Sequence, residues 1–155
     1  MNIAKEVVNK LRSKHYTFSA AESVTGGKLI SMITEVPGAS KILEQSYVVY
    51  SNDAKISVLG VDKTTIDRFG VVSEEVALEM AQHLKAITKA DVVITTTGEA
   101  GPVKNVIDIA LGTVCFGLII ADKKQSFTQV FSGERTEIIE SAVNFILQLL
   151  LDQLD

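Results

Sequence analysis

The sequence contains very few of the residues that build disulfide frameworks and metal centres. Its 155 residues include one cysteine, Cys115, and two histidines, His15 and His83, which are far apart in the chain. A single cysteine cannot form an internal disulfide, and this one lies in an apolar run, 114–121, typical of a buried strand. Zinc sites need several histidine, cysteine or carboxylate ligands at close spacing, and neither histidine has such neighbours. We therefore expect no metal ion and a cytoplasmic location.

Clustered positive charge and long apolar runs are also missing. The chain has 15 Lys and Arg against 19 Asp and Glu, a net charge of −4 and a pI near 5.2. A nucleic-acid-binding groove needs clustered basic residues to neutralise phosphates. The apolar run from Val106 is interrupted by Asp108, Gly112 and Gly117, and residues 1–12 fit an amphipathic helix better than a signal peptide. We expect no nucleic-acid partner and no membrane contact.

The length and the order of patterns predict an α/β fold. A chain of 155 residues with 46% apolar residues is large enough to bury the core of one domain, here expected over 1–155. Strand-like and helix-like patterns alternate along it, which favours helices packed on a sheet. Strands at 113–121 and 126–131, joined by a charged turn at 122–125, predict an antiparallel hairpin. We predict a three-layer α/β/α sandwich with a mixed sheet.

The remaining elements follow from apolar periodicity and turn residues. We predict further strands at 16–21, 45–50 and 91–97, and helices at 1–12, 25–33, 64–69 and 135–154. The Ser51-Asn52-Asp53 cluster predicts the start of a short helix that carries Lys55 in its first turn. Another helix starts at Ser73, and its apolar stripe is predicted to contain Ala77, Met80, Ala81, Leu84 and Ile87.

The last predicted helix, 135–154, is apolar nearly all round between residues 145 and 151. Such a helix is either buried inside its own chain or covered by another subunit. We predict a homo-oligomer, with a centrally buried helix as the alternative.

A serine stands where the first strand gives way to a glycine-rich helix start. Residues 21–27 read Ala-Glu-Ser-Val-Thr-Gly-Gly, with Ser23 at the junction. Glycines let a ligand approach the backbone, and free N–H groups at a helix start can bind an oxyanion or a phosphate. The pattern favours either a nucleophilic serine or an ordinary N-cap serine. A second ligand-binding edge is expected at 95–98, Thr-Thr-Thr-Gly, after a buried strand.

A lysine is the best available base for such a serine. No histidine follows Ser23 at a plausible base position, and a lysine with a lowered pKa is the known substitute. The predicted place of Lys55 in a first helical turn disfavours its ammonium form. Tyr50, at the end of the preceding strand, could relay a proton or orient the pair. The alternatives are a solvated lysine and a core tyrosine.

Five segments together resemble the CinA C-terminal domain family. They are residues 21–27, 48–55, 70–77, 97–102 and 111–114, which occur in the family's order. The resemblance implies a nicotinamide mononucleotide deamidase, with Ser23 as nucleophile and Tyr50 and Lys55 as its helpers. Many family members carry an additional N-terminal domain that resembles molybdopterin-binding proteins, and we expect the form without it. The implied reaction needs no cofactor.

The same resemblance suggests a substrate site. Backbone N–H groups around residues 25–27 would hold the oxyanion, and two short segments after the strand at 91–97 would line the opposite wall. Arg135 would meet the substrate phosphate, the alternative being a surface ion pair with Glu134. The substrate-binding residues expected are thus Thr25, Gly26, Gly27, Thr97, Gly98, Ala100, Gly101 and Arg135.

One segment departs from the family pattern. Residues 103–111 lack the glycines that members usually have there, and Glu99 replaces a residue that is commonly apolar. A carboxylate at that position would repel a substrate phosphate. The sequence therefore leaves a second hypothesis open: a catalytically inactive domain that binds a nucleotide or a protein.

Overall fold

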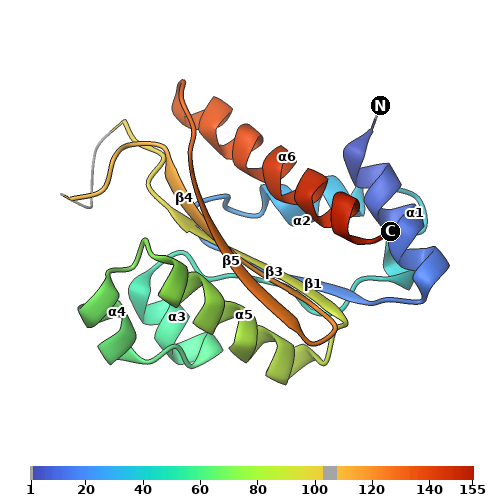
Figure 1. Cartoon of the computed structure of the whole chain (residues 1–155), viewed down its shortest axis with the longest axis horizontal. Coiled ribbons are helices and arrows are strands. Elements are labelled where there is room, and N and C mark those ends of the chain that lie inside the picture. The colour runs from blue at the N-terminus through green and yellow to red at the C-terminus, as the bar shows by residue number, and fades with distance from the viewer. Residues whose placement is uncertain (1, 103–107) are drawn as a thin grey trace.

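A five-stranded sheet lies between two layers of helices in the computed structural model, which describes residues 2–102 and 108–155 (Figure 1). Its strands are β1 (Phe18–Glu22), β2 (Tyr47–Val48), β3 (Val92–Gly98), β4 (Thr113–Ile120) and β5 (Lys123–Val130). The helices are α1 (Ile3–Lys14), α2 (Lys28–Thr34), α3 (Asn52–Leu59), α4 (Lys63–Phe69), α5 (Glu74–Thr88) and α6 (Arg135–Gln153), with a 3₁₀ turn at Ala39–Lys41.

The sheet is mixed, as predicted. Its strand order is β2-β1-β3-β4-β5; β1 runs parallel to β2 and β3, whereas β4 is antiparallel to both of its neighbours. Ala21 of β1 is paired with Thr95 of β3. The segments that follow these two parallel strands therefore leave the sheet on the same side, at the carboxyl ends of the strands, which is where ligand sites form in open α/β sheets.

The three-layer arrangement is also confirmed. The helices α1, α2 and α6 pack on one face of the sheet through a core that includes Phe18, Ile94 and Phe116, and α3, α4 and α5 cover the other face (Figure 1). Both faces of the central strands are buried, so β3 and β4 read as continuous apolar or β-branched runs.

Two predicted helix starts agree with the structure. The Ser51 side chain accepts a hydrogen bond from the Ala54 N–H at 3.0 Å, and Ser73 accepts one from the Val76 N–H at 3.2 Å. Each serine satisfies an N–H group that has no partner within its helix. The cap at Ser51 fixes the start of α3 and places Lys55 at the end of its first turn.

Two elements near the candidate serine are shorter than predicted. The strand expected at 45–50 is reduced to β2, because the Ser46 hydroxyl takes the hydrogen bond from Ala20 N–H that a backbone carbonyl would take in a longer ladder. The helix expected from Thr25 starts only at Lys28. Gly26 and Gly27 have φ angles of +59° and +100°, which an α-helix does not allow.

Two further predictions were wrong in detail. The hairpin turn consists of Ala121 and Asp122, so the charged Lys123 and Lys124 belong to the edge strand β5, where lysines discourage pairing with other chains. In α5 the buried stripe continues from Leu84 to Thr88, whereas Ile87 is 41% exposed because it lies one position off that stripe.

The apolar character of α6 is accounted for within the chain. Five of its apolar residues between positions 142 and 150 are buried against α1, α2 and the sheet, and Phe145, Leu149 and Leu151 pack against the same core at its margin. The observation that suggested a homo-oligomer therefore fits the alternative of a buried helix, and the oligomer stays a prediction. No helix in the described ranges combines the length and the apolarity needed to cross a bilayer.

A substitution at Gly117 in β4 tests how tightly α5 packs on the sheet. A Cβ atom there would lie 2.4 Å from the Ala77 carbonyl oxygen and 2.5 Å from the Thr95 Oγ1. Because the carbonyl belongs to a helix backbone, we expect Gly117→Ala to lower the free energy of unfolding by about 2–3 kcal/mol. Urea denaturation measures this, with the exposed Gln129→Ala in the adjacent strand as a near-neutral control. Equal urea midpoints for the glycine variant and the wild type would show that α5 can move away.

Candidate active site

A cavity of about 160 Å³ lies at the sheet edge where β1 and β3 end. Several residues singled out in the sequence line it: Ser23, Tyr50, Lys55, Thr97, Gly98, Ala100 and Arg135. They come from the turn after β1, the segment before α3 and its first turn, the end of β3 with the residues that follow it, and the start of α6. Segments far apart in the sequence thus meet at one small concave site, which is the usual geometry of a ligand site.

Ser23 and Lys55 are in direct contact in this cavity. The Lys55 Nζ lies 2.9 Å from the Ser23 Oγ and 3.2 Å from the backbone oxygen of Tyr50. The Ser23 hydroxyl donates a long hydrogen bond of 3.4 Å to the same Tyr50 oxygen. A shift of the hydroxyl proton from that carbonyl to a neutral Lys55 amine therefore needs only rotation about the Cβ–Oγ bond. The pair has the proximity that proton transfer requires.

The Lys55 amine is held in a setting that disfavours its charged form. Lys55 is only 1% exposed, and no carboxylate within residues 2–102 and 108–155 forms an ion pair with it. Burial lowers the pKa of Lys55 from 10.5 to about 8, because the ammonium loses hydration that two hydrogen bonds to neutral oxygens only partly replace. About one tenth of the amines are then neutral at pH 7. The alternative of a solvated lysine is therefore wrong.

Tyr50 contributes differently from the predicted proton relay. Its ring is 56% exposed, so it is not a core aromatic, and its hydroxyl accepts a hydrogen bond from Arg135 Nη2 at 2.7 Å. Since Lys55 touches Ser23 directly, no phenol lies between them. The backbone carbonyl of Tyr50, rather than its hydroxyl, is the group that contacts the pair.

Arg135 lies at the rim of the cavity and is fixed by two hydrogen bonds. Besides the bond to Tyr50, its Nη1 donates to the Gly101 backbone oxygen at 2.6 Å. Gly101 thus supports the rim through its carbonyl and is not among the lining residues. Glu134 does not pair with Arg135; it caps α6, accepting from the N–H of Glu137. The predicted alternative of a surface ion pair is therefore wrong.

The glycines after Ser23 are not free to bind an oxyanion. The Gly26 N–H donates to the Ser23 backbone oxygen at 3.0 Å, and the Gly27 N–H donates to the Glu22 carboxylate at 3.2 Å. The Thr25 hydroxyl also points to Glu22 rather than into the cavity. By contrast, the N–H groups of Val24 and Thr25 form no hydrogen bond with any described residue, and Val24 lines the cavity. Of the donors predicted at 25–27, only the Thr25 N–H is available, and the Val24 N–H, which was not predicted, is available beside it.

Sequence reasoning missed three lining residues, Val24, Asn52 and Val71. Asn52 is one helical turn before Lys55, so its presence follows once Ser51 is recognised as the cap. Glu99, which the sequence singled out as a departure from the family pattern that would affect phosphate binding, is buried and also lines the cavity. Residues 103–107, which belong to the altered segment, lie outside the described part of the chain.

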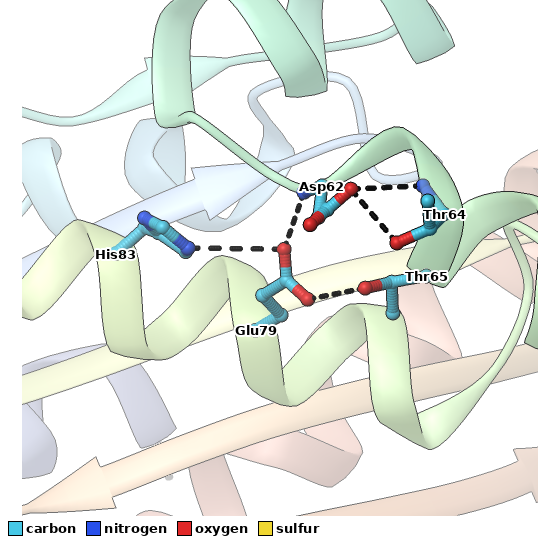
Figure 2. Close-up of polar contacts among 5 residues, drawn as sticks. All are labelled: Asp62, Thr64, Thr65, Glu79 and His83. Atoms are coloured by element: carbon cyan, nitrogen blue, oxygen red, sulfur yellow. Dashed lines mark hydrogen bonds and ion pairs between the residues drawn. The ribbon is translucent and has the colours of Figure 1, made fainter.

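The cysteine and the histidines lie elsewhere. Cys115 is buried in β4, its Sγ 3.5 Å from the Thr128 hydroxyl, and burial raises the pKa of its thiol, which disfavours the reactive thiolate. His83 lies 3.7 Å from Glu79 among the side chains that join α4 to α5 (Figure 2). His15 ends α1. Across the described ranges, no three His, Cys, Asp or Glu side chains gather as metal ligands would.

Comparison with known proteins identifies relatives over the whole fold. The model of the CinA C-terminal domain matches residues 1–154. A CinA-like protein from Petrotoga mobilis is 41% identical over 136 residues, 88% of this chain and 34% of that protein. Another CinA-like protein, from Chlorobium limicola, is 43% identical over 128 residues, 82% of this chain and 29% of that protein. The chain thus spans about a third of the length of these curated relatives.

Solved structures agree with this result. The crystal structure of a competence or damage-inducible protein from Enterobacter asburiae superposes with a TM-score of 0.95 at 36% identity, covering 99% of this chain and 96% of that one. A CinA superfamily protein from Enterobacter cloacae gives the same TM-score at 35% identity, covering 99% of this chain and 90% of that one. Sequence and fold match over nearly the full chain, and this protein therefore belongs to the CinA C-terminal domain family.

Proposed function

We propose that this protein is an amidohydrolase that converts nicotinamide mononucleotide into nicotinate mononucleotide and ammonia. The observation that carries the proposal is the contact of 2.9 Å between Ser23 Oγ and a buried Lys55 whose pKa is lowered to about 8. A serine becomes a nucleophile when an adjacent base removes its proton, and a lysine serves as that base only in its neutral form. The burial of Lys55 makes this form accessible near neutral pH.

The first half of the reaction forms an acyl-enzyme. Neutral Lys55 takes the proton of Ser23, and Oγ attacks the carboxamide carbon to give a tetrahedral oxyanion. The free N–H groups of Val24 and Thr25 are suited to hold that charge, and one such donor contributes about 3 kcal/mol in enzymes where it has been removed. The Lys55 ammonium then returns its proton to the amide nitrogen, the C–N bond breaks and ammonia leaves.

The second half restores the enzyme. Lys55, neutral again, takes a proton from water, and the resulting hydroxide attacks the ester carbon of the acyl-serine. The C–Oγ bond breaks, Ser23 recovers its proton from Lys55, and nicotinate mononucleotide is released. One base therefore serves both half-reactions, in line with the direct contact between Lys55 and the serine.

Arg135 is the group best suited to the substrate phosphate. Its guanidinium is at the cavity rim, held by Tyr50 and Gly101, and no described carboxylate neutralises it by an ion pair. A planar guanidinium binds phosphate oxygens through paired hydrogen bonds. The carboxamide would enter the cavity beside Ser23 while the phosphate remains at the rim.

A second function is a domain that binds a nucleotide or a protein without turnover. Glu99 favours this alternative, because it is buried in the cavity lining and a carboxylate there repels a phosphate. An enzyme assay separates the two functions.

The proposal is tested by measuring ammonia release from nicotinamide mononucleotide with the purified protein. Free nicotinamide and glutamine serve as controls, because both carry a carboxamide but lack the ribose phosphate. We expect ammonia from the mononucleotide and little from either control. Calorimetric binding of the mononucleotide with no ammonia release would contradict the proposal and support the binding domain.

The lowered pKa of Lys55 predicts the pH dependence. Because the neutral amine is the reactive form, we expect kcat/KM to rise about tenfold per pH unit below pH 8 and to level off above it. Rates measured between pH 6 and 9.5 test this. A rate that instead falls as the pH passes through 8 would mean that the ammonium form is needed.

A further inference from the structure

We infer that Glu22, Thr25 and Thr96, here called the Glu22 network, are positioning residues that hold the Ser23 turn ready for reaction. The inference deepens the proposed amide hydrolysis and rests on it. None of the three side chains lines the cavity, so the network acts through the backbone of the turn.

The network starts from a buried carboxylate. Glu22 is 1% exposed, and its Oε1 accepts hydrogen bonds from the Thr25 hydroxyl at 2.7 Å, the Gly27 N–H at 3.2 Å and the Leu29 N–H at 3.0 Å. Its Oε2 accepts from the Ile30 N–H at 3.0 Å. Four donors compensate the anion that burial would otherwise make costly. The backbone between Ser23 and the first turn of α2 is thereby held in place by hydrogen bonds to the Glu22 carboxylate.

The direction of the remaining hydrogen bonds follows from the number of protons. The single hydroxyl proton of Thr25 goes to Glu22, so in its 2.9 Å contact with Thr96 the Thr25 oxygen must accept and Thr96 must donate. Thr96 Oγ1 in turn accepts from the Ser23 N–H at 3.1 Å. The bonds run in one direction, from the serine backbone through two hydroxyls to the carboxylate. Hydrogen bonds aligned in this way polarise and strengthen one another.

This arrangement fixes both ends of the reactive turn. Ser23 is tied through its N–H to β3, and Thr25 is tied through its side chain to Glu22, while the Gly26 N–H closes the turn on the Ser23 oxygen. The Ser23 N–H is used by Thr96 and cannot serve an oxyanion. The N–H groups of Val24 and Thr25 lie between these two fixed points and stay available to an oxyanion. Donors held in place before the reaction stabilise a developing charge without reorganisation.

A neighbouring threonine provides the matched control. Thr95 is also buried, and its hydroxyl donates to the Ala77 carbonyl at 2.6 Å on the opposite face of β3. Thr95→Val and Thr96→Val each remove one buried hydroxyl from adjacent positions of the same strand. Only the second change interrupts the network.

The experiment measures two quantities in these variants. The first is kcat and KM for nicotinamide mononucleotide. The second is the rate at which a fluorophosphonate labels Ser23: Oγ bonds to phosphorus, the P–F bond breaks, fluoride leaves and Lys55 takes the proton. Labelling depends on the nucleophile and its oxyanion donors but not on the identity of the natural substrate.

We expect Thr96→Val to lower kcat and the labelling rate by roughly 10- to 100-fold, with KM changed by less than about twofold. Thr96→Ser, which keeps the hydroxyl, should restore both rates to within about threefold. Thr95→Val should lose stability but keep its kcat. Thr25→Val interrupts the network at the next residue and gives the same test if Thr96→Val does not fold.

The outcomes separate this inference from the proposed function. Wild-type kcat and labelling in Thr96→Val, or equal losses in the Thr95 and Thr96 variants, would overturn the positioning role and leave the amidase intact. Labelling of Ser23 that slows in Thr96→Val, in a protein that releases no ammonia from the mononucleotide, would support the network and overturn the substrate. A wild-type protein that neither labels nor turns over would overturn both.

Discussion

Replacing Ser23 by alanine should reduce ammonia release from nicotinamide mononucleotide by about 1,000-fold or more. The change removes the atom that we propose forms the acyl-enzyme, and loss of a serine nucleophile in other hydrolases has effects of this size or larger. Among the described residues, Ser23 Oγ forms hydrogen bonds only with Lys55 and the Tyr50 carbonyl, so the fold should remain. A coupled ammonia assay measures the rate, and thermal unfolding checks the fold.

Ser31→Ala is the matched control for this variant. Ser31 is an exposed serine on α2, the helix that follows the Ser23 turn, so the same atomic change there should leave turnover unaltered. Near-normal activity in Ser23→Ala would mean that water is attacked directly or that another residue forms the acyl-enzyme, and the assigned nucleophile would be wrong.

Replacing Lys55 by methionine should abolish activity and at the same time stabilise the protein. Activity is lost, by about 1,000-fold, because methionine has a similar length but cannot accept a proton. Stability rises because the folded chain no longer has to bury an amine whose pKa is lowered to about 8. We expect a gain of about 1–2 kcal/mol at pH 7, less than the full pKa shift implies, since Ser23 and the Tyr50 carbonyl lose a partner.

The pH dependence of this gain has a definite sign. The unfolded lysine holds its proton up to a pKa near 10.5, whereas the folded one releases it near 8. The wild type therefore carries the full cost of burial below pH 8, and that cost disappears as the pH rises from 8 to 10.5. The difference between Lys55→Met and the wild type should shrink over the same range.

Urea denaturation at pH 7 and at pH 10 tests the stability argument. Lys28→Met, a change at an exposed lysine, should alter neither stability nor turnover and serves as the control. A Lys55→Met protein that is less stable than the wild type at pH 7 would show that the buried amine is favourably solvated in the folded state. The lowered pKa would then have no structural basis.

The sequence alone determined much of the fold. Apolar periodicity locates the helices, and the hairpin before the last helix indicates the mixed sheet, because both depend on local patterns that repeat every two or every three to four residues. Ser51 and Ser73 mark the starts of α3 and α5, since a capping side chain acts within three residues. The same local sequence patterns place Ser23 after a strand and Lys55 in a first helical turn.

The tertiary structure alone decided how these groups meet. The 2.9 Å contact between Ser23 and Lys55, the hydrogen bond between the Tyr50 hydroxyl and Arg135, and the hydrogen bond from the Ser23 N–H to Thr96 all join residues that are far apart in the sequence. Local periodicity carries no information about such distances. They arise because the parallel pairing of β1 with β2 and β3 brings the ends of all three strands to one side of the sheet, where burial then lowers the pKa of the lysine.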